Sequence, residues 1–183
     1  LLEPSKGFVY IDNKNLYSHK NHNNLYDWRS SISHVPQDIY LTDNTIAENI
    51  AFGVEKSSID MNKVKLAAKN AQIANFIEKF PEKYNAIVGE RGVRLSGGQK
   101  QRIGIARALY KESEVLFLDE ASSALDTKTE LNLMSSIEEL SRDITIIMIA
   151  HRLTTVARCD RIISLKEGTI EADGTPSQII EKS

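Results

Sequence analysis

Two short apolar runs, EVLFLDE at 114–120 and ITIIMIA at 144–150, constrain the fold of this chain most strongly. Both are rich in large or β-branched apolar residues, as buried strands are. A helical pattern from about Thr127 to Leu140 separates them, and Asp126 is well placed to cap that helix. Because strands that alternate with helices pair in parallel, the sequence predicts an α/β fold with a mostly parallel sheet.

Length and charge limit the class of protein. The chain has 183 residues, which suits one globular domain. Twenty-three Lys and Arg residues against 25 Asp and Glu give a net charge of -2, so no general attraction to nucleic acid is expected and any anion site must be local. A single cysteine, Cys159, excludes an internal disulfide framework and is compatible with cytoplasmic exposure. No apolar run approaches the roughly 20 residues of a membrane span, and we expect any membrane crossing to be made elsewhere.

Several further segments have recognisable local patterns. GFVYID alternates as a strand does, and the Asn-rich stretch 13–28 is expected to be a loop with one short helical turn. Met61–Phe80 has the spacing of an amphipathic helix pair. RIISLKEG, at 161–168, predicts a strand, and Thr175 with Pro176 predicts the start of a last helix.

Two adjacent acids, Asp119 and Glu120, end the first apolar run. Open α/β folds bind ligands at the carboxyl ends of their strands. Since side chains alternate along a strand, one acid can hold Mg²⁺ through water while the other faces a hydrolytic water. The alternative is that both acids are solvated, or favour the N-terminus of the next helix.

A Ser-Gly-Gly-Gln stretch opens a basic amphipathic helix. Ser96 offers a hydroxyl, and Gly97 and Gly98 leave backbone N–H groups uncovered at a helix N-terminus, which suits a phosphate. The alternative is an ordinary helix start, with Ser96 as N-cap and the basic residues Lys100, Arg102 and Arg107 on a solvated face.

Taken together, five motifs resemble the nucleotide-binding domain of an ABC transporter. LSGGQ at 95–99 matches the signature motif, VLFLDE at 115–120 is similar to the Walker B strand, and SALD at 123–126 is similar to the D-loop. Gln37 matches the Q-loop glutamine, and His151 matches the switch histidine. The motifs follow the order of that family, and the resemblance covers essentially the whole chain.

The resemblance implies a role for each motif residue. Glu120 would polarise the attacking water, and His151 would hold the γ-phosphate, although a histidine at a strand end can also be purely structural. Asp119 and Gln37 would contact Mg²⁺. The nucleotide-binding residues implied by the resemblance are Ser96, Gly97, Gly98, Gln99, Gln37 and Asp126.

The same resemblance implies partners. Two such domains would pack head to tail, so that Ser96, Gly97 and Gly98 meet the γ-phosphate held by the partner domain. ATP would then hold the dimer closed and hydrolysis would release it. The phosphate-binding pattern G-x-x-x-x-G-K-[ST] is absent from the 183 residues. We therefore expect the chain to begin inside the helix that follows that loop, and to hydrolyse no ATP by itself.

Two segments indicate the exporter branch. TIAENIAFG at 45–53 and VGERG at 88–92 are similar to exporter sequences, in which the glutamate-containing segment contacts coupling helices of the membrane domains. A solvated surface turn is the alternative for 88–92. An exporter subunit would work at the cytoplasmic face of the inner or plasma membrane, and its membrane domains would choose among lipid, glycolipid, peptide and drug substrates.

The resemblance also implies an architecture. An incomplete RecA-like P-loop NTPase core would comprise residues 1–37 and 111–183, and an inserted helical subdomain would comprise about 38–110. Rotation of that subdomain, through Gln37 to Thr42, would move the signature toward or away from a partner's phosphate. Two other functions remain open, a non-transport ABC ATPase acting on ribosomes or DNA and a non-catalytic ABC module. The absence of a charge surplus and of long heptads disfavours the first, and the presence of Glu120 and His151 disfavours the second.

Overall fold

The computed structural model describes residues 3–17, 23–92, 94–121, 124–140, 144–150 and 152–180. The chain divides into two compact units, Leu1–Ile147 and Met148–Ser183, and each is described by itself.

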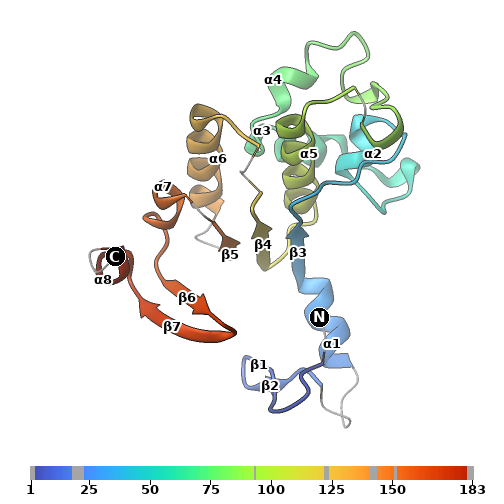
Figure 1. The fold of residues 1–183 in the computed structure, drawn as a ribbon. Helices are drawn as coiled ribbons and strands as arrows, with labels where there is room; N and C mark the ends of the chain where they lie inside the picture. The colour runs from blue at the N-terminus through green and yellow to red at the C-terminus, as the bar shows by residue number, and fades with distance from the viewer. Residues whose placement is uncertain are drawn as a thin grey trace. The chain divides into compact units, whose positions relative to one another are not determined.

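A run of helices separates β3 from β4, and strand and helix alternate from β4 to β6 (Figure 1). The strands are β1 (Tyr10–Ile11), β2 (Lys14–Asn15), β3 (Ile32–Val35), β4 (Val115–Asp119), β5 (Thr145–Ile149), β6 (Ile162–Lys166) and β7 (Thr169–Gly174). The α-helices are α1 (Asn23–Ser31), α2 (Ile46–Ile50), α3 (Met61–Asn70), α4 (Ala74–Ile77), α5 (Gly97–Tyr110), α6 (Thr127–Leu140), α7 (Leu153–Val156) and α8 (Pro176–Ile180). Three 3₁₀ turns lie at Lys56–Ser58, Lys83–Asn85 and Glu90–Gly92.

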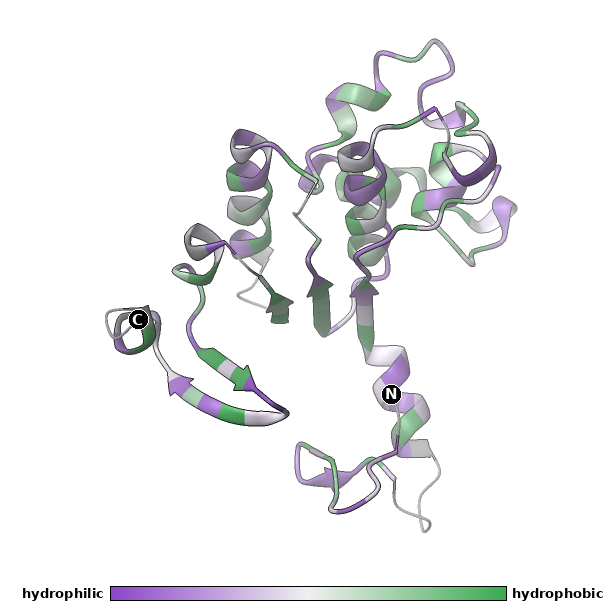
Figure 2. Ribbon diagram, viewed as in Figure 1, coloured by the Kyte–Doolittle hydropathy of each residue, from purple (hydrophilic) through white to green (hydrophobic). Residues whose placement is uncertain are grey.

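The central sheet has the strand order β3-β4-β5. β3 and β4 pair in parallel, from Ile32 opposite Val115 to Val35 opposite Leu118. Both runs are strands, and Figure 2 shows them as hydrophobic. Leu116 and Leu118 of β4 are buried, whereas the residues of β5 are exposed or half-buried. The predicted α/β fold class is therefore confirmed.

The core of the first unit lies between α3, α5, α6 and the sheet. Its fully buried side chains include Val64 on α3, Ile103 and Ile105 on α5, Leu116 on β4 and Ile137 on α6. On α3 the buried residues Val64, Ala67 and Ala68 recur at helical spacing, and on α6 Leu133 and Ile137 do the same, so one face of each of these two helices is apolar. Burial of apolar surface places α5 beside α3 and against β3.

Local capping rules explain where the main helices begin. The Asp60 carboxylate accepts hydrogen bonds from the backbone N–H groups of Asn62 and Lys63, at 2.8 and 3.2 Å, and thereby starts α3. Asp126 does the same for α6, where Thr129 N donates to its Oδ1 at 3.0 Å. The predicted helix pair in 61–80 is present as α3 and α4, and the predicted cap of α6 is confirmed.

The N-terminal part differs from the sequence expectation. The expected strand at 7–12 is reduced to β1, and the stretch expected to be a loop with one helical turn contains the nine-residue helix α1. Asparagine is a weak helix former, so the many asparagines at 13–28 favoured the prediction of a loop. Leu25 and Trp28 nevertheless lie three residues apart and are half-buried, so one face of α1 packs against protein.

The second unit contains an antiparallel hairpin, β6-β7, and α8. The predicted strand at 161–168 is β6, and its turn places Glu167 and Gly168 at φ values of 48° and 76°. Such positive values are typical of a tight hairpin turn. α8 begins at Pro176, as predicted, and Thr175 N donates to Gln178 Oε1 at 2.9 Å. Among the described residues, no helix combines the length and the apolar character needed to cross a membrane.

Candidate functional site

The register of β3 and β4 brings two predicted site residues together. Val35 lies opposite Leu118, so the residues that follow each strand leave the same edge of the sheet. Gln37 comes two residues after Val35, and Glu120 comes two residues after Leu118. The Gln37 amide Nε2 donates to Glu120 Oε2 at 3.3 Å, across 83 positions of sequence.

The end of β4 has an unusual backbone. Glu120 has a φ of 49°, in the left-handed region that a non-glycine residue adopts at a cost of roughly 1 kcal/mol. The chain therefore turns sharply out of the strand at this residue. Asp119 and Glu120 are both half-buried, at the edge where parallel sheets bind ligands. Strain of this kind is often retained at functional sites.

The Ser96–Gln99 stretch forms a capping box at the start of α5. Gln99 N donates to Ser96 Oγ at 3.4 Å, and Ser96 N donates to Gln99 Oε1 at 2.8 Å. Leu95 is buried and anchors the turn, whereas Ser96 and Gly97 are exposed. A hydroxyl that accepts one hydrogen bond can still donate its own proton. The cap that was the alternative interpretation of Ser96 is therefore present, and the 14-residue helix still has an open N-terminus of the kind that attracts anions, so phosphate binding there stays a prediction.

Asp126 is engaged as the cap of α6. Thr129 Oγ1 donates to Asp126 Oδ2 at 2.6 Å, in addition to the backbone bond to Oδ1. Both bonds hold the pKa of the Asp126 carboxyl below its usual value, and the bond from the Thr129 hydroxyl has the larger effect. Its predicted contact with nucleotide stays a prediction. His151, and Ser123 of the D-loop pattern, lie outside the described residues.

The signature turn and the segment before α6 touch each other. A Cβ on Gly97 would lie 3.6 Å from Ala124 Cβ, and a Cβ on Gly98 would lie 2.9 Å from Ala124 O. Ala124 N donates to Gln101 Oε1 at 3.1 Å. Sequence reasoning did not identify Gln101. It lies three and four residues after Gly98 and Gly97, on the same face of the helix, and this spacing is the signal that could have indicated it.

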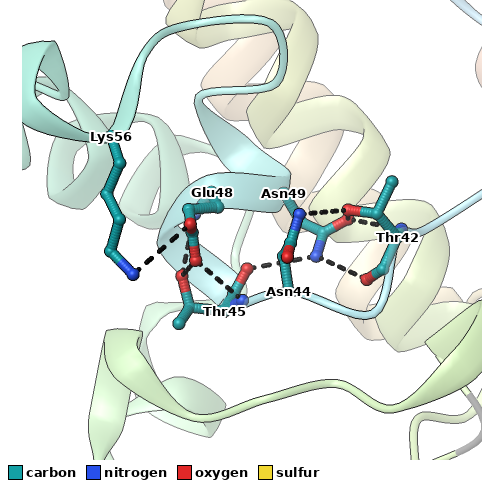
Figure 3. Close-up of polar contacts among 6 residues, drawn as sticks. All are labelled: Thr42, Asn44, Thr45, Glu48, Asn49 and Lys56. Carbon is teal, nitrogen blue, oxygen red and sulfur yellow. Dashed lines mark hydrogen bonds and ion pairs between the residues drawn. The ribbon is translucent and has the colours of Figure 1, made fainter.

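A polar network beside α5 was also not predicted (Figure 3). Asn49 is fully buried, accepts a hydrogen bond from Thr42 N at 3.0 Å and donates to Thr42 O at 3.0 Å. Thr45 and Glu48 form a second capping box, which the T-x-x-E pattern could have indicated. The Thr45 hydroxyl donates to Glu48 Oε2 at 2.6 Å and is the main cause of the lowered pKa of Glu48.

Arg107 joins this network to the signature helix. Its Nε donates to Asn49 O at 2.9 Å, its Nη1 donates to Tyr40 O at 3.1 Å, and its guanidinium lies 4.7 Å from the ring centre of Phe52. Burial lowers the pKa of Arg107. α5 is therefore tied to the segment that follows Gln37, and Arg107 does not belong to a fully solvated basic face.

Known proteins match the chain over its whole length. The ABC transporter family model matches residues 1–123. The chain is 40% identical to the ABC transporter ATM1 of Toxoplasma gondii, over 100% of this chain and 16% of that protein. It is 39% identical to an ATP-dependent lipid A-core flippase of Haemophilus influenzae, over 97% of this chain and 30% of that protein.

A solved structure of a bacterial Atm1-family ABC exporter with ATP bound is also similar, with a TM-score of 0.87 and 39% identity over 98% of this chain and 30% of that chain. This chain therefore spans less than a third of each of these three proteins. Such matches at this identity show common ancestry as well as a common fold. The chain belongs to the ABC transporter family and is of the exporter type in sequence and fold.

Proposed function

We propose that this chain is the ATP-hydrolysing part of a longer exporter subunit. The main support for this proposal is the hydrogen bond between Gln37 and Glu120 at the carboxyl ends of β3 and β4. Asp119 directly precedes Glu120 at the end of β4. Family membership implies that ATP is the nucleotide. The chain's short span relative to its relatives supports a longer parent protein.

Glu120 would act as the general base. A carboxylate that is half-buried at the sheet edge can accept a proton from a water held beside it. The Gln37 amide donates to one carboxylate oxygen and thereby orients the group. His151 would hold the γ-phosphate in line with that water, as the family resemblance implies.

Asp119 and Gln37 would hold Mg²⁺ together with the phosphates. Mg²⁺ in nucleotide sites takes one or two protein oxygen ligands and fills the rest of its shell with phosphate and water. One carboxylate and one amide oxygen at the same sheet edge fit that demand. Among the described residues no cluster of three or more His, Cys, Asp or Glu side chains forms a metal site, so the phosphates would have to complete it. The bound ion would neutralise charge on the phosphates.

The signature turn would serve a second, head-to-tail nucleotide-binding domain. Ser96 and Gly97 are exposed at the open N-terminus of α5, and Gly98 and Gln99 are partly exposed. Backbone N–H groups and a hydroxyl at such a position suit the γ-phosphate of an ATP held by the partner domain. Asp126 would contribute to the same shared site.

Transmembrane domains of an exporter would be the other partner, with this chain at the cytoplasmic face of the membrane. Tyr40 and Phe52 are 63% and 54% exposed, and both contact Arg107 of α5. Exposed aromatic residues that are held in place by hydrogen-bonded neighbours suit a protein contact.

The proposed domain division follows the family resemblance. The helical subdomain, at about 38–110, comprises α2, α3, α4 and α5, and the core comprises residues 1–37 and 111–183.

The test is ATP hydrolysis by the full-length subunit and by two matched carboxylate variants. Glu120→Gln keeps the shape of the side chain and removes its basicity, and we expect turnover to fall by roughly a thousandfold. Glu114→Gln makes the same change at the exposed opposite end of β4 and should leave turnover unaltered. Equal activity of the two variants would refute the proposed role of Glu120.

A further inference from the structure

The first turns of α5 pack against the backbone of their own chain just before α6. A Cβ added to Gly98 would lie 2.9 Å from Ala124 O and 3.3 Å from Leu125 Cδ2. A distance below 3.0 Å to a backbone oxygen is not tolerated by a real Cβ. Gly98 therefore has a packing role within this chain, separate from any contact with phosphate: it lets the backbone at Ala124 approach the helix.

Gln101 holds the same backbone by a hydrogen bond. Its side chain is 5% exposed, and its Oε1 accepts from Ala124 N at 3.1 Å. Gln101 lies one turn along α5 from Gly97 and Gly98, so packing and hydrogen bonding act on Ala124 from one helix face. Removal of the acceptor would break the hydrogen bond that ties Ala124 to α5, at a cost of about 1 kcal/mol.

Ala124 lies in sequence between two residues of the candidate site. Ala124 follows Glu120 by four residues and precedes Asp126 by two. Asp126 is itself fixed as the cap of α6, and Glu120 already adopts a strained backbone conformation. Ala124 is therefore held to α5 at a position four residues after Glu120 and two residues before Asp126.

We propose that Gln101 is a positioning residue for ATP hydrolysis: it holds Ala124, four residues after Glu120, against the signature helix and thereby constrains Glu120. The signature turn and the Glu120 segment of one chain then move together. In a head-to-tail dimer these two features belong to different ATP sites, so Gln101 couples the closure of one site to the catalytic geometry of the other. This inference rests on the proposed function.

The test compares three variants of the full-length subunit. Gln101→Met keeps the length of the side chain and removes the acceptor, and we expect kcat to fall roughly tenfold, with KM for ATP changed less than about twofold. Gln101→Glu keeps an acceptor oxygen and should retain at least about half of the wild-type kcat. Gln72→Met is the matched control. The Gln72 amide Nε2 also donates to a residue of another helix, Ser136 Oγ at 3.0 Å, but this hydrogen bond does not involve Ala124.

Thermal unfolding of each variant separates positioning from stability. The proposal requires a lower kcat in Gln101→Met at a melting temperature close to that of Gln72→Met. It is overturned if Gln101→Met has the wild-type kcat, if its KM rises in parallel, or if Gln101→Glu is as impaired as Gln101→Met. If the wild-type subunit hydrolyses no ATP, or if Glu120→Gln keeps the wild-type turnover, the proposed function is refuted instead.

Discussion

Ile39 packs directly onto the backbone of Gly104, in the middle of α5. A Cβ at Gly104 would overlap Ile39 Cδ1 and lie 2.8 Å from Ile39 Cγ1. Ile39 follows Gln37 by two residues, so the signature helix and the segment after β3 are in contact at this point. A glycine inside a helix normally costs about 1 kcal/mol, and here it provides the space for that contact.

Gly104→Ala is expected to destabilise the protein despite the better helix propensity of alanine. Overpacking of this kind costs about 1 to 3 kcal/mol, more than the roughly 1 kcal/mol gained in the helix. Urea unfolding of the variant measures the change. The double variant Gly104→Ala with Ile39→Ala should recover much of the loss. A single variant that is more stable than the wild type would contradict the close packing.

Gln37→Glu is expected to shift the activity of the full-length subunit toward higher pH. The new carboxylate would face Glu120 at about the distance of the present 3.3 Å bond. Two like charges this close raise the pKa of one member of the pair, so the pair would be fully ionised only at higher pH. The pH profile of ATP hydrolysis checks this. Gln37→Leu also removes the hydrogen bond but adds no charge, and an identical profile for both variants would exclude the charge effect.

Arg107→Lys is expected to destabilise the protein by about 2 kcal/mol, because a lysine amine cannot reproduce the guanidinium fork. The three acceptors, Asn49 O, Asn49 Oδ1 and Tyr40 O, come from two segments. Denaturant unfolding gives the loss in free energy. Arg29→Lys, at an exposed position on α1, is the matched control and should change stability by less than about 0.5 kcal/mol.

Glu48 should contribute stability at neutral pH and lose it in acid. Its folded pKa lies below the ordinary value of 4.5, chiefly because the Thr45 hydroxyl donates to it. The contribution is therefore complete above pH 4.5 and disappears as the pH falls through the folded pKa. The stability difference between wild type and Glu48→Gln, measured at pH 7 and at acidic pH, should shrink in acid. For Glu55→Gln, an exposed neighbour, we expect no such trend.

Local rules in the sequence determined most of the elements and the family. Capping residues and apolar periodicity act within a few positions, so the starts of α5 and α6, the helix pair α3 and α4, and the strands β4, β5 and β6 could all be predicted. The five motifs are contiguous or single residues, which is why they identified the family without any knowledge of the fold. α1 was underestimated, since its asparagines are weak helix formers and its stability depends on packing.

Tertiary structure alone decided which residues meet. Gln37 and Glu120 lie 83 positions apart, and their contact follows from the register of β3 with β4. The contacts of Gln101 with Ala124 and of Arg107 with Asn49 arise because α5 packs between distant segments. No local pattern encodes such contacts, because their geometry is set by the burial of apolar faces elsewhere in the chain.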